Sequence, residues 1–217
     1  VDRERMTMTI DIETLVADLQ PVRPVSPRGG VLIALFAAAV VVAIVSAAFG
    51  LRADVVAGSP HPMVMLREGM LLLLGFASLA AVVASARPGV GQSSTGWRWA
   101  LAAASLFPLT SIALAMTTEG FPLDVLFSVD GPWCLGISLS GGLLIGAGLT
   151  VWLRRGAPTA LNRIGWLVGL ASGSFGAFAY GLHCPSITVF YVGLWYTGAI
   201  LLCALLGRLI VPRLIRW

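Results

Sequence analysis

Two cysteines and one histidine at the ends of apolar stretches are the residues of this chain best suited to chemistry. Cys184 follows His183 in a short break between two apolar stretches, and Cys134 lies at the start of an earlier one. Thiolates with an imidazole bind soft metal ions better than calcium or magnesium, and two neighbouring thiols can also form a disulfide. Cys203, the third cysteine, lies inside an apolar stretch, where we expect it to pack as a small apolar residue.

The sequence leaves three interpretations of Cys134 and Cys184 open. They could form a permanent disulfide, be two unrelated small residues, or be a switchable pair that senses an oxidant or a thiophilic metal, with His183 as an auxiliary metal ligand. The chain has no CxxC motif, P-loop, dinucleotide fingerprint, HExxH motif or nucleophile elbow. We therefore predict that it is not an enzyme and has no cofactor apart from transient heavy-metal binding.

The composition places these residues in a membrane protein. The chain is 58% hydrophobic and 11% charged, whereas soluble domains are about 25% charged. Stretches long enough to cross the roughly 30 Å of bilayer hydrocarbon recur along it. We predict an all-α polytopic protein with six transmembrane helices at 31–50, 65–86, 97–116, 133–153, 161–182 and 189–211. The transmembrane domain would span 31–211, followed by a basic cytoplasmic tail at 212–217.

The arginines predict the orientation of these spans. All 14 basic residues are arginine, and only Arg52 and Arg67 fall on the side opposite the others. Because cytoplasmic loops of membrane proteins are enriched in basic residues, both termini should be cytoplasmic in a bacterial inner membrane. Cys134 and Cys184 then share the outer face. We expect Glu68 at the rim and no charge deep in a span, which disfavours a transporter with a buried ionisable path.

Glycines in the fourth and fifth predicted spans indicate close helix packing. Gly165, Gly169 and Gly173 recur every four residues, as do Gly142 and Gly146. Small residues at this spacing allow two helix backbones to approach closely. Packing within one bundle is the favoured interpretation, and a homodimer is the alternative.

Residues 1–30 form a separate cytoplasmic leader. Ile12, Leu15, Val16 and Leu19 follow helical spacing, and the proline-containing stretch from Pro21 ends the pattern. A helix of about ten residues is marginal alone in water, so its apolar face needs a covering surface. That surface could be lipid or a protein partner; the acidic polar face favours a protein, because helices on lipid surfaces usually carry basic residues there.

The leader, Cys134 and the turn His183-Cys184-Pro185 together resemble the NrsF-type negative regulators of sigma-F, which are six-span bacterial inner-membrane anti-sigma factors. The resemblance covers nearly the whole chain. It implies a protein that sequesters an extracytoplasmic-function sigma factor and makes no direct contact with nucleic acid. The residues that would bind the sigma factor are Ile12, Leu15, Val16, Asp18, Leu19, Pro21 and Arg23.

The resemblance also implies a role for the outer cysteines. In such proteins they respond to heavy-metal stress such as chromium or cadmium, and that role would fall to Cys134 and Cys184. The alternative from another functional class is a small membrane transporter or a membrane redox protein acting on thiols or quinones.

Overall fold

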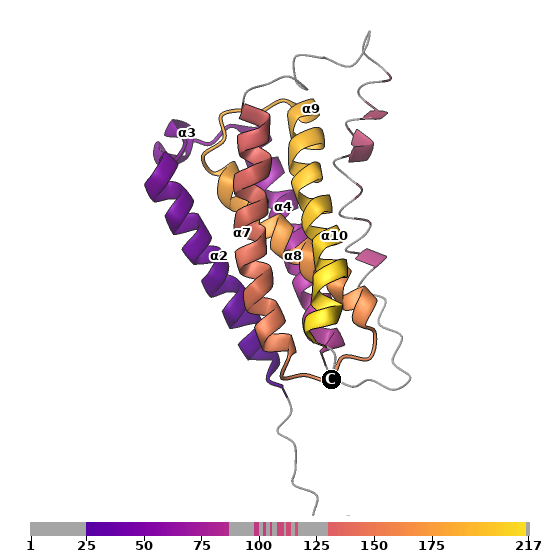
Figure 1. Cartoon of the computed structure of the whole chain (residues 1–217). Helices are drawn as coiled ribbons and strands as arrows, with labels where there is room; N and C mark the ends of the chain where they lie inside the picture. The colour runs from indigo at the N-terminus through magenta and orange to yellow at the C-terminus, as the bar shows by residue number, and fades with distance from the viewer. Residues whose placement is uncertain are drawn as a thin grey trace, which may run out of the picture.

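The computed structural model describes residues 25–86 and 130–215, with scattered residues between 98 and 116. In these parts every regular element is helical. The elements are α2 (Pro27–Phe49), α3 (Ala53–Val56), α4 (Pro62–Ser85), α7 (Asp130–Leu153), α8 (Leu161–Gly181), α9 (Val189–Tyr191), the π-helical segment η1 (Val192–Tyr196) and α10 (Thr197–Leu214). The long helices lie side by side in one bundle, as Figure 1 shows.

Four of these helical stretches are long and apolar enough to cross a membrane: Pro27–Phe49, Pro62–Ser85, Asp130–Leu153 and Val189–Leu214. The prediction of an all-α protein with membrane helices is confirmed. α8 coincides with a fifth predicted span, although its glycines and serines make it less apolar. The predicted span 97–116 lies mostly outside the described residues, and those described there are helical. Six spans and their orientation stay predictions.

Two helices begin with the signals that their sequences carry. Pro27 and Pro62 occupy the first turns of α2 and α4, where a missing backbone N–H costs nothing. The Ser26 hydroxyl accepts a hydrogen bond from the Gly29 N–H, at 3.2 Å. The His61 Nδ1 accepts one from the Met63 N–H, also at 3.2 Å. His61 is therefore the N-cap of α4.

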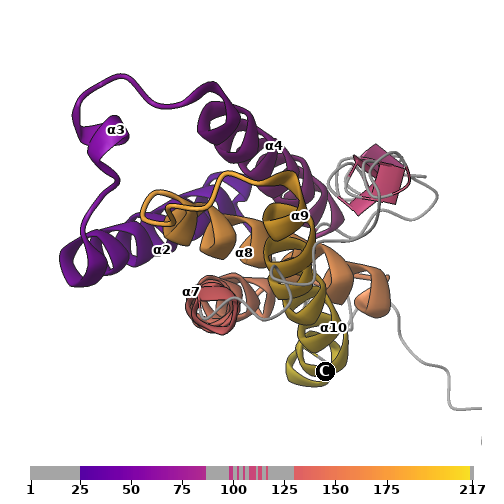
Figure 2. The ribbon, with the colours of Figure 1, turned by 90° about the horizontal axis from the view of Figure 1, so that it is seen from above.

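α8 is the centre of the bundle. It packs against α10, α7 and α4, and Figure 2 shows it between them from above. Its glycines permit this packing: a Cβ at Gly165 would lie 2.7 Å from the Gly207 carbonyl oxygen of α10, and one at Gly176 would meet the backbone of α7. The predicted packing within one bundle is confirmed for these glycines.

Apolar side chains cover the outside of the bundle. On α2, Leu32 and Phe36 are 66% and 73% exposed, and Leu73 of α4 and Leu209 of α10 are also exposed. The polar side chain of Ser138, by contrast, is buried inside the bundle. A bundle with apolar side chains outside and polar groups inside suits lipid as its surroundings.

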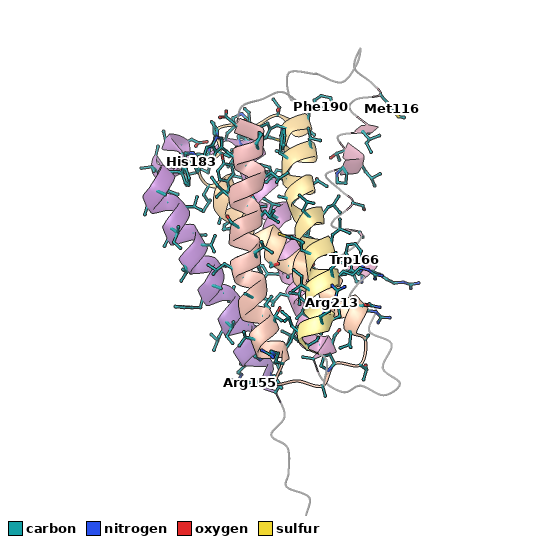
Figure 3. All side chains as sticks on the ribbon, in the orientation of Figure 1. Met116, Arg155, Trp166, His183, Phe190 and Arg213 are labelled. Atoms are coloured by element: carbon teal, nitrogen blue, oxygen red, sulfur yellow. The ribbon has the colours of Figure 1, made fainter. Side chains whose placement is uncertain are left out.

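The two ends of the bundle differ in composition. One end, called the cysteine end below, carries the start of α7, the loop around α3 and the turn at 182–188 between α8 and α9. Figure 3 shows His183 at this end and Arg155 at the other. Gly30 near the start of α2 packs against Trp152 near the end of α7, so Arg28 also lies at the end opposite the cysteines.

Candidate functional site

Cys134 and Cys184 meet at the cysteine end, although 49 residues separate them in sequence. Cys134 lies in the first turns of α7, and Cys184 lies in the turn that follows α8. Both are fully buried free thiols, and their side chains are close enough for a thiol of one to donate a hydrogen bond to the sulfur of the other. The structure therefore brings the two predicted residues together, with no disulfide between them.

Three buried hydroxyls surround the sulfur pair. Ser138 and Tyr191 lie beside Cys134, and Tyr196 lies beside Cys184. None of the three hydroxyl oxygens has a partner that meets strict hydrogen-bond geometry. Buried polar groups are normally paired. These O–H groups are therefore available to donate hydrogen bonds to a cysteine sulfur that is ionised or bound to a metal.

The π-helical segment explains why both tyrosines reach this site. Residues five apart in an α-helix point in directions about 140° apart. A π turn, closed by i→i+5 hydrogen bonds, returns them to nearly the same side. Tyr191 directly precedes the segment and Tyr196 is its last residue, and their ring centroids are 6.4 Å apart. Nothing in the hydropathy of the last predicted span indicated this irregularity.

The surroundings of Cys184 favour its thiolate. A hydrogen bond from the Cys134 thiol lowers the pKa of the Cys184 thiol below its usual value, helped by the Tyr196 hydroxyl, the Ser186 backbone N–H and the charge of Arg67. Burial opposes this shift, because it disfavours the charged form. The lowered pKa makes Cys184 the better nucleophile and metal ligand of the pair.

His183 does not join the two sulfurs. Its Nδ1 lies 3.1 Å from the Gly50 carbonyl oxygen, and its ring packs near Phe49 and Tyr180. Among the described residues, no group of three or more His, Cys, Asp and Glu side chains is placed to hold a metal ion. A role for His183 as an auxiliary ligand therefore stays a prediction that would require its ring to turn.

A buried ion pair on α4 is the main feature that the sequence analysis missed. Arg67 and Glu68 were assigned to the outer side and its rim, but they are only 2% and 7% exposed. The Arg67 Nε donates to the Glu68 Oε1 at 2.8 Å. Gly181 packs against the Glu68 carboxylate, where a larger residue would collide with it. Two adjacent charges inside an apolar stretch were the available signal.

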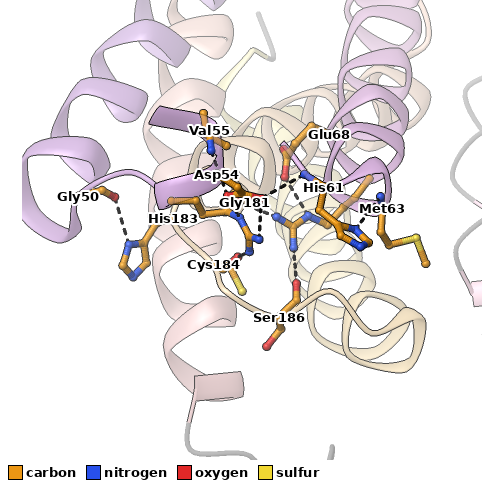
Figure 4. A network of polar contacts seen from close by, with 12 residues as sticks. Gly50, Asp54, Val55, His61, Met63, Glu68, Gly181, His183, Cys184 and Ser186 are labelled. Carbon is orange, nitrogen blue, oxygen red and sulfur yellow. Dashed lines mark hydrogen bonds and ion pairs between the residues drawn. The ribbon is translucent and has the colours of Figure 1, made fainter. Parts of the chain in front are cut away.

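A second arginine contacts the same turn. The Arg52 Nη1 donates to the Cys184 carbonyl oxygen at 2.6 Å, while the Nε and Nη2 bind the Asp54 carboxylate at 2.9 and 3.0 Å. Figure 4 shows this polar network around Cys184. The bond to Arg52 holds the pKa of the Asp54 carboxyl well below its usual range, with help from the His61 N–H.

The other predicted residues lie elsewhere. Cys203 is buried between α10, α7 and α8, which agrees with a packing role. The leader residues predicted to bind a sigma factor lie outside the described residues. They are Ile12, Leu15, Val16, Asp18, Leu19, Pro21 and Arg23. The predicted tail at 212–217 begins inside α10, which continues to Leu214.

Comparison with known proteins gives one consistent result. The family model "Negative regulator of sigma F" (NrsF) matches residues 15–217. The anti-sigma-F factor NrsF of Caulobacter vibrioides is 31% identical over 210 residues, which is 95% of this chain and 97% of that protein. The probable anti-sigma-F factor NrsF of Azospira oryzae is 27% identical over 159 residues, or 72% of this chain and 73% of that protein. No solved structure matches the chain.

Proposed function

The chain belongs to the NrsF family of negative regulators of sigma F, and we propose that it is a membrane-bound anti-sigma factor of the bacterial inner membrane. It binds an extracytoplasmic-function sigma factor through its cytoplasmic leader and keeps it from RNA polymerase. The family match begins at residue 15, so it includes part of the leader. The apolar stripe and acidic face of the leader suit a basic partner protein.

The adjacency of Cys134 and Cys184 in a buried site is the observation that carries the sensing part of the proposal. A divalent soft metal ion would bind both sulfurs and displace two thiol protons. A two-electron oxidant would instead join them in a disulfide, with loss of two protons and two electrons. Both reactions replace two separate thiols with a bonded linkage, a disulfide or a metal bridge, and soft metals prefer thiolates to the oxygen ligands nearby.

Such a linkage would act on the packing between helices. Cys134 belongs to α7 and Cys184 to the turn after α8, so a change at the pair alters how these helices meet. α7 packs against α2, and the leader directly precedes α2 in sequence. The signal alters sigma-factor binding only if the leader has different affinities in the two packing states.

A pull-down of a co-produced sigma factor from membranes tests both the binding role of the leader and the sensing role of the cysteine pair. We expect the intact chain to retain the sigma factor and to release it after cadmium exposure, with a loss of affinity of roughly 5- to 150-fold, the usual range of allosteric coupling. A chain lacking residues 1–28 should retain none. The Cys134→Ser and Cys184→Ser variants should bind the sigma factor but no longer release it.

Cys203→Ser is the matched control, because Cys203 is a buried cysteine that packs between α7, α8 and α10 and not at the pair; this variant should bind and release normally. Retention of the sigma factor by the chain without its leader would contradict the binding role of the leader. Normal cadmium release by both single serine variants at the pair would contradict the sensing role of the two cysteines.

A further inference from the structure

Two arginines from outside the 182–188 turn bind the backbone that surrounds Cys184. Arg67 donates from its Nη2 to the Gly181 carbonyl at 2.6 Å and from its Nη1 to the Ser186 carbonyl at 2.7 Å. Arg52 donates from its Nη1 to the Cys184 carbonyl at 2.6 Å and from its backbone N–H to the Leu182 carbonyl at 3.1 Å. Carbonyls before, at and after Cys184 are therefore held from α4 and from the α2–α3 loop.

Each guanidinium is itself held in place. Arg67 is bound by the Glu68 carboxylate and lies 5.1 Å from the centre of the Tyr196 ring. Arg52 is bound through two nitrogens by the Asp54 carboxylate. The planar guanidinium has five donors in a fixed fork, so one side chain can bind a carboxylate and two carbonyls simultaneously. An ammonium group has no such fork.

Stability alone gives little reason for this arrangement. A buried ion pair often contributes less than well-packed apolar residues of the same volume, because both charges lose their hydration. The Glu68 Oε2 is also buried without a partner. Moreover, Arg52 and Arg67 are the two arginines that fall on the side of the predicted spans opposite all the others. Both exceptions to that distribution contact the turn that carries Cys184.

We propose that Arg67 and Arg52 are positioning residues that hold the 181–186 backbone so that Cys184 faces Cys134. The assignment rests on the proposed function only in treating these cysteines as the responsive pair. We call Arg52 and Arg67, with their bonds to these carbonyls, the clamp. When the clamp is removed, the two sulfurs should meet less often, so their effective concentration for each other should fall.

The test measures disulfide formation between Cys134 and Cys184 in native membranes, with no sigma factor present. Cys203→Ser serves as the background, and the azo oxidant diamide accepts the two electrons and two protons that the thiols lose. Free thiols are counted by the gel shift of a maleimide polymer after denaturation. The double variant Arg67→Met/Glu68→Met should react about tenfold more slowly than the background, because it removes the clamp without leaving an unpaired buried charge.

Two further variants separate positioning from folding and from charge. Arg67→Lys retains the charge but cannot bind both carbonyls, so it should also react slowly while melting near the background temperature. Arg155→Met, at the opposite end, should react like the background. The reduction potential of the pair should rise in the double variant by about 30 mV for each tenfold loss of effective concentration.

The proposal would be overturned if a folded double variant formed the disulfide at the background rate and with the background reduction potential. It would also be overturned if Arg67→Lys formed the disulfide as fast as the background. If the double variant does not reach the membrane folded, Arg52→Gln decides the question, because it leaves the buried pair intact. Slower disulfide formation in Arg52→Gln supports the clamp, and an unchanged rate overturns it. None of these readouts involves sigma-factor release, so failure of the clamp and failure of the anti-sigma function remain distinguishable.

Discussion

The two ion pairs of the cysteine end differ in how exposed they are. The side chains of Arg52 and Asp54 are 12% and 25% exposed, whereas those of Arg67 and Glu68 are 2% and 10% exposed. A pair open to solvent contributes little net stability, so the value of Asp54 lies in aiming Arg52 at the Cys184 carbonyl. Loss of one partner of the enclosed pair would instead destabilise the fold strongly, because the other charge would stay buried and unpaired.

The depressed pKa of Asp54 predicts how the Arg52 contact depends on pH. Its pKa is depressed in the folded protein below the reference value of 3.8, chiefly by the bond to Arg52. A depressed pKa contributes stability that is fully present above the unfolded pKa and is lost only as pH falls through the folded one. The rate of Cys134–Cys184 disulfide formation, divided at each pH by the thiolate fraction of Cys184 measured in the same protein, should therefore show no loss of the Arg52 contact between pH 7 and pH 5.

Asp54→Asn is the comparison for that prediction. The amide keeps the shape but loses the charge, so Arg52 is held less firmly at every pH and disulfide formation should be slower throughout. A drop in the corrected rate of the unsubstituted protein near pH 5 would show that the Asp54–Arg52 pair titrates in that window, contrary to the prediction.

The residue scale also shows what sequence could and could not predict about the site. Cys134 and Cys184 were predictable as neighbours because both fall at ends of apolar stretches on the same side, and hydropathy reports depth along the helix. Burial of Arg67 and Glu68 depends on which face of α4 meets α8, which hydropathy does not report. The ring direction of His183 depends on the Gly50 carbonyl, which is 133 residues away.

At the scale of elements, α8 organises the bundle through its glycines, which let neighbouring helices approach its backbone. Its residues at 167–177 are all buried, and its glycines lie against the backbones of α7 and α10. Without a strong hydrophobic drive between helices in lipid, such close contact supplies much of the attraction. The spacing of these glycines made this packing predictable, whereas the π turn that aims Tyr191 and Tyr196 had no comparable sequence pattern.

Gly169→Ala should destabilise the bundle. A Cβ there would lie 2.5 Å from the Ala204 Cα and would also meet the Cys203 carbonyl oxygen, both backbone atoms that cannot move aside cheaply. The helices must separate, with an expected loss of about 1–3 kcal/mol. Thermal unfolding in detergent micelles measures it, and a melting temperature equal to that of the unsubstituted protein would contradict the packing role.

Gly136→Ala is the matched control on α7. Nothing lies within 4 Å of a Cβ at Gly136, so no contact is disturbed. Alanine is also favoured over glycine in a helix by about 0.5–1 kcal/mol. The melting temperature should therefore remain or rise, which separates the effect of close packing from that of any glycine substitution.

At the scale of the whole molecule, the two ends of the bundle have separate tasks in the proposed function. The cysteine end holds Arg52 and Arg67 in fixed contacts with the turn, so these two arginines are explained by structure rather than by membrane orientation. Arg28, in the first turn of α2, and Arg155, in the loop after α7, lie at the opposite end. Once the two clamp residues are set aside, the orientation signal becomes one-sided.

That asymmetry predicts the topology of the chain in the membrane. Reporter insertion after Gly58, which has a φ of +70° and no neighbour within 4 Å of a Cβ, should leave alkaline phosphatase active, because that enzyme folds only outside the cytoplasm. Insertion after Thr159, in the loop beside Arg155, should leave it inactive and a fluorescent protein bright. The reverse pattern would place the leader outside the cell membrane, where no sigma factor could reach it. Membrane topology is therefore the whole-molecule condition on which the coupling of the cysteine pair to a cytoplasmic partner depends.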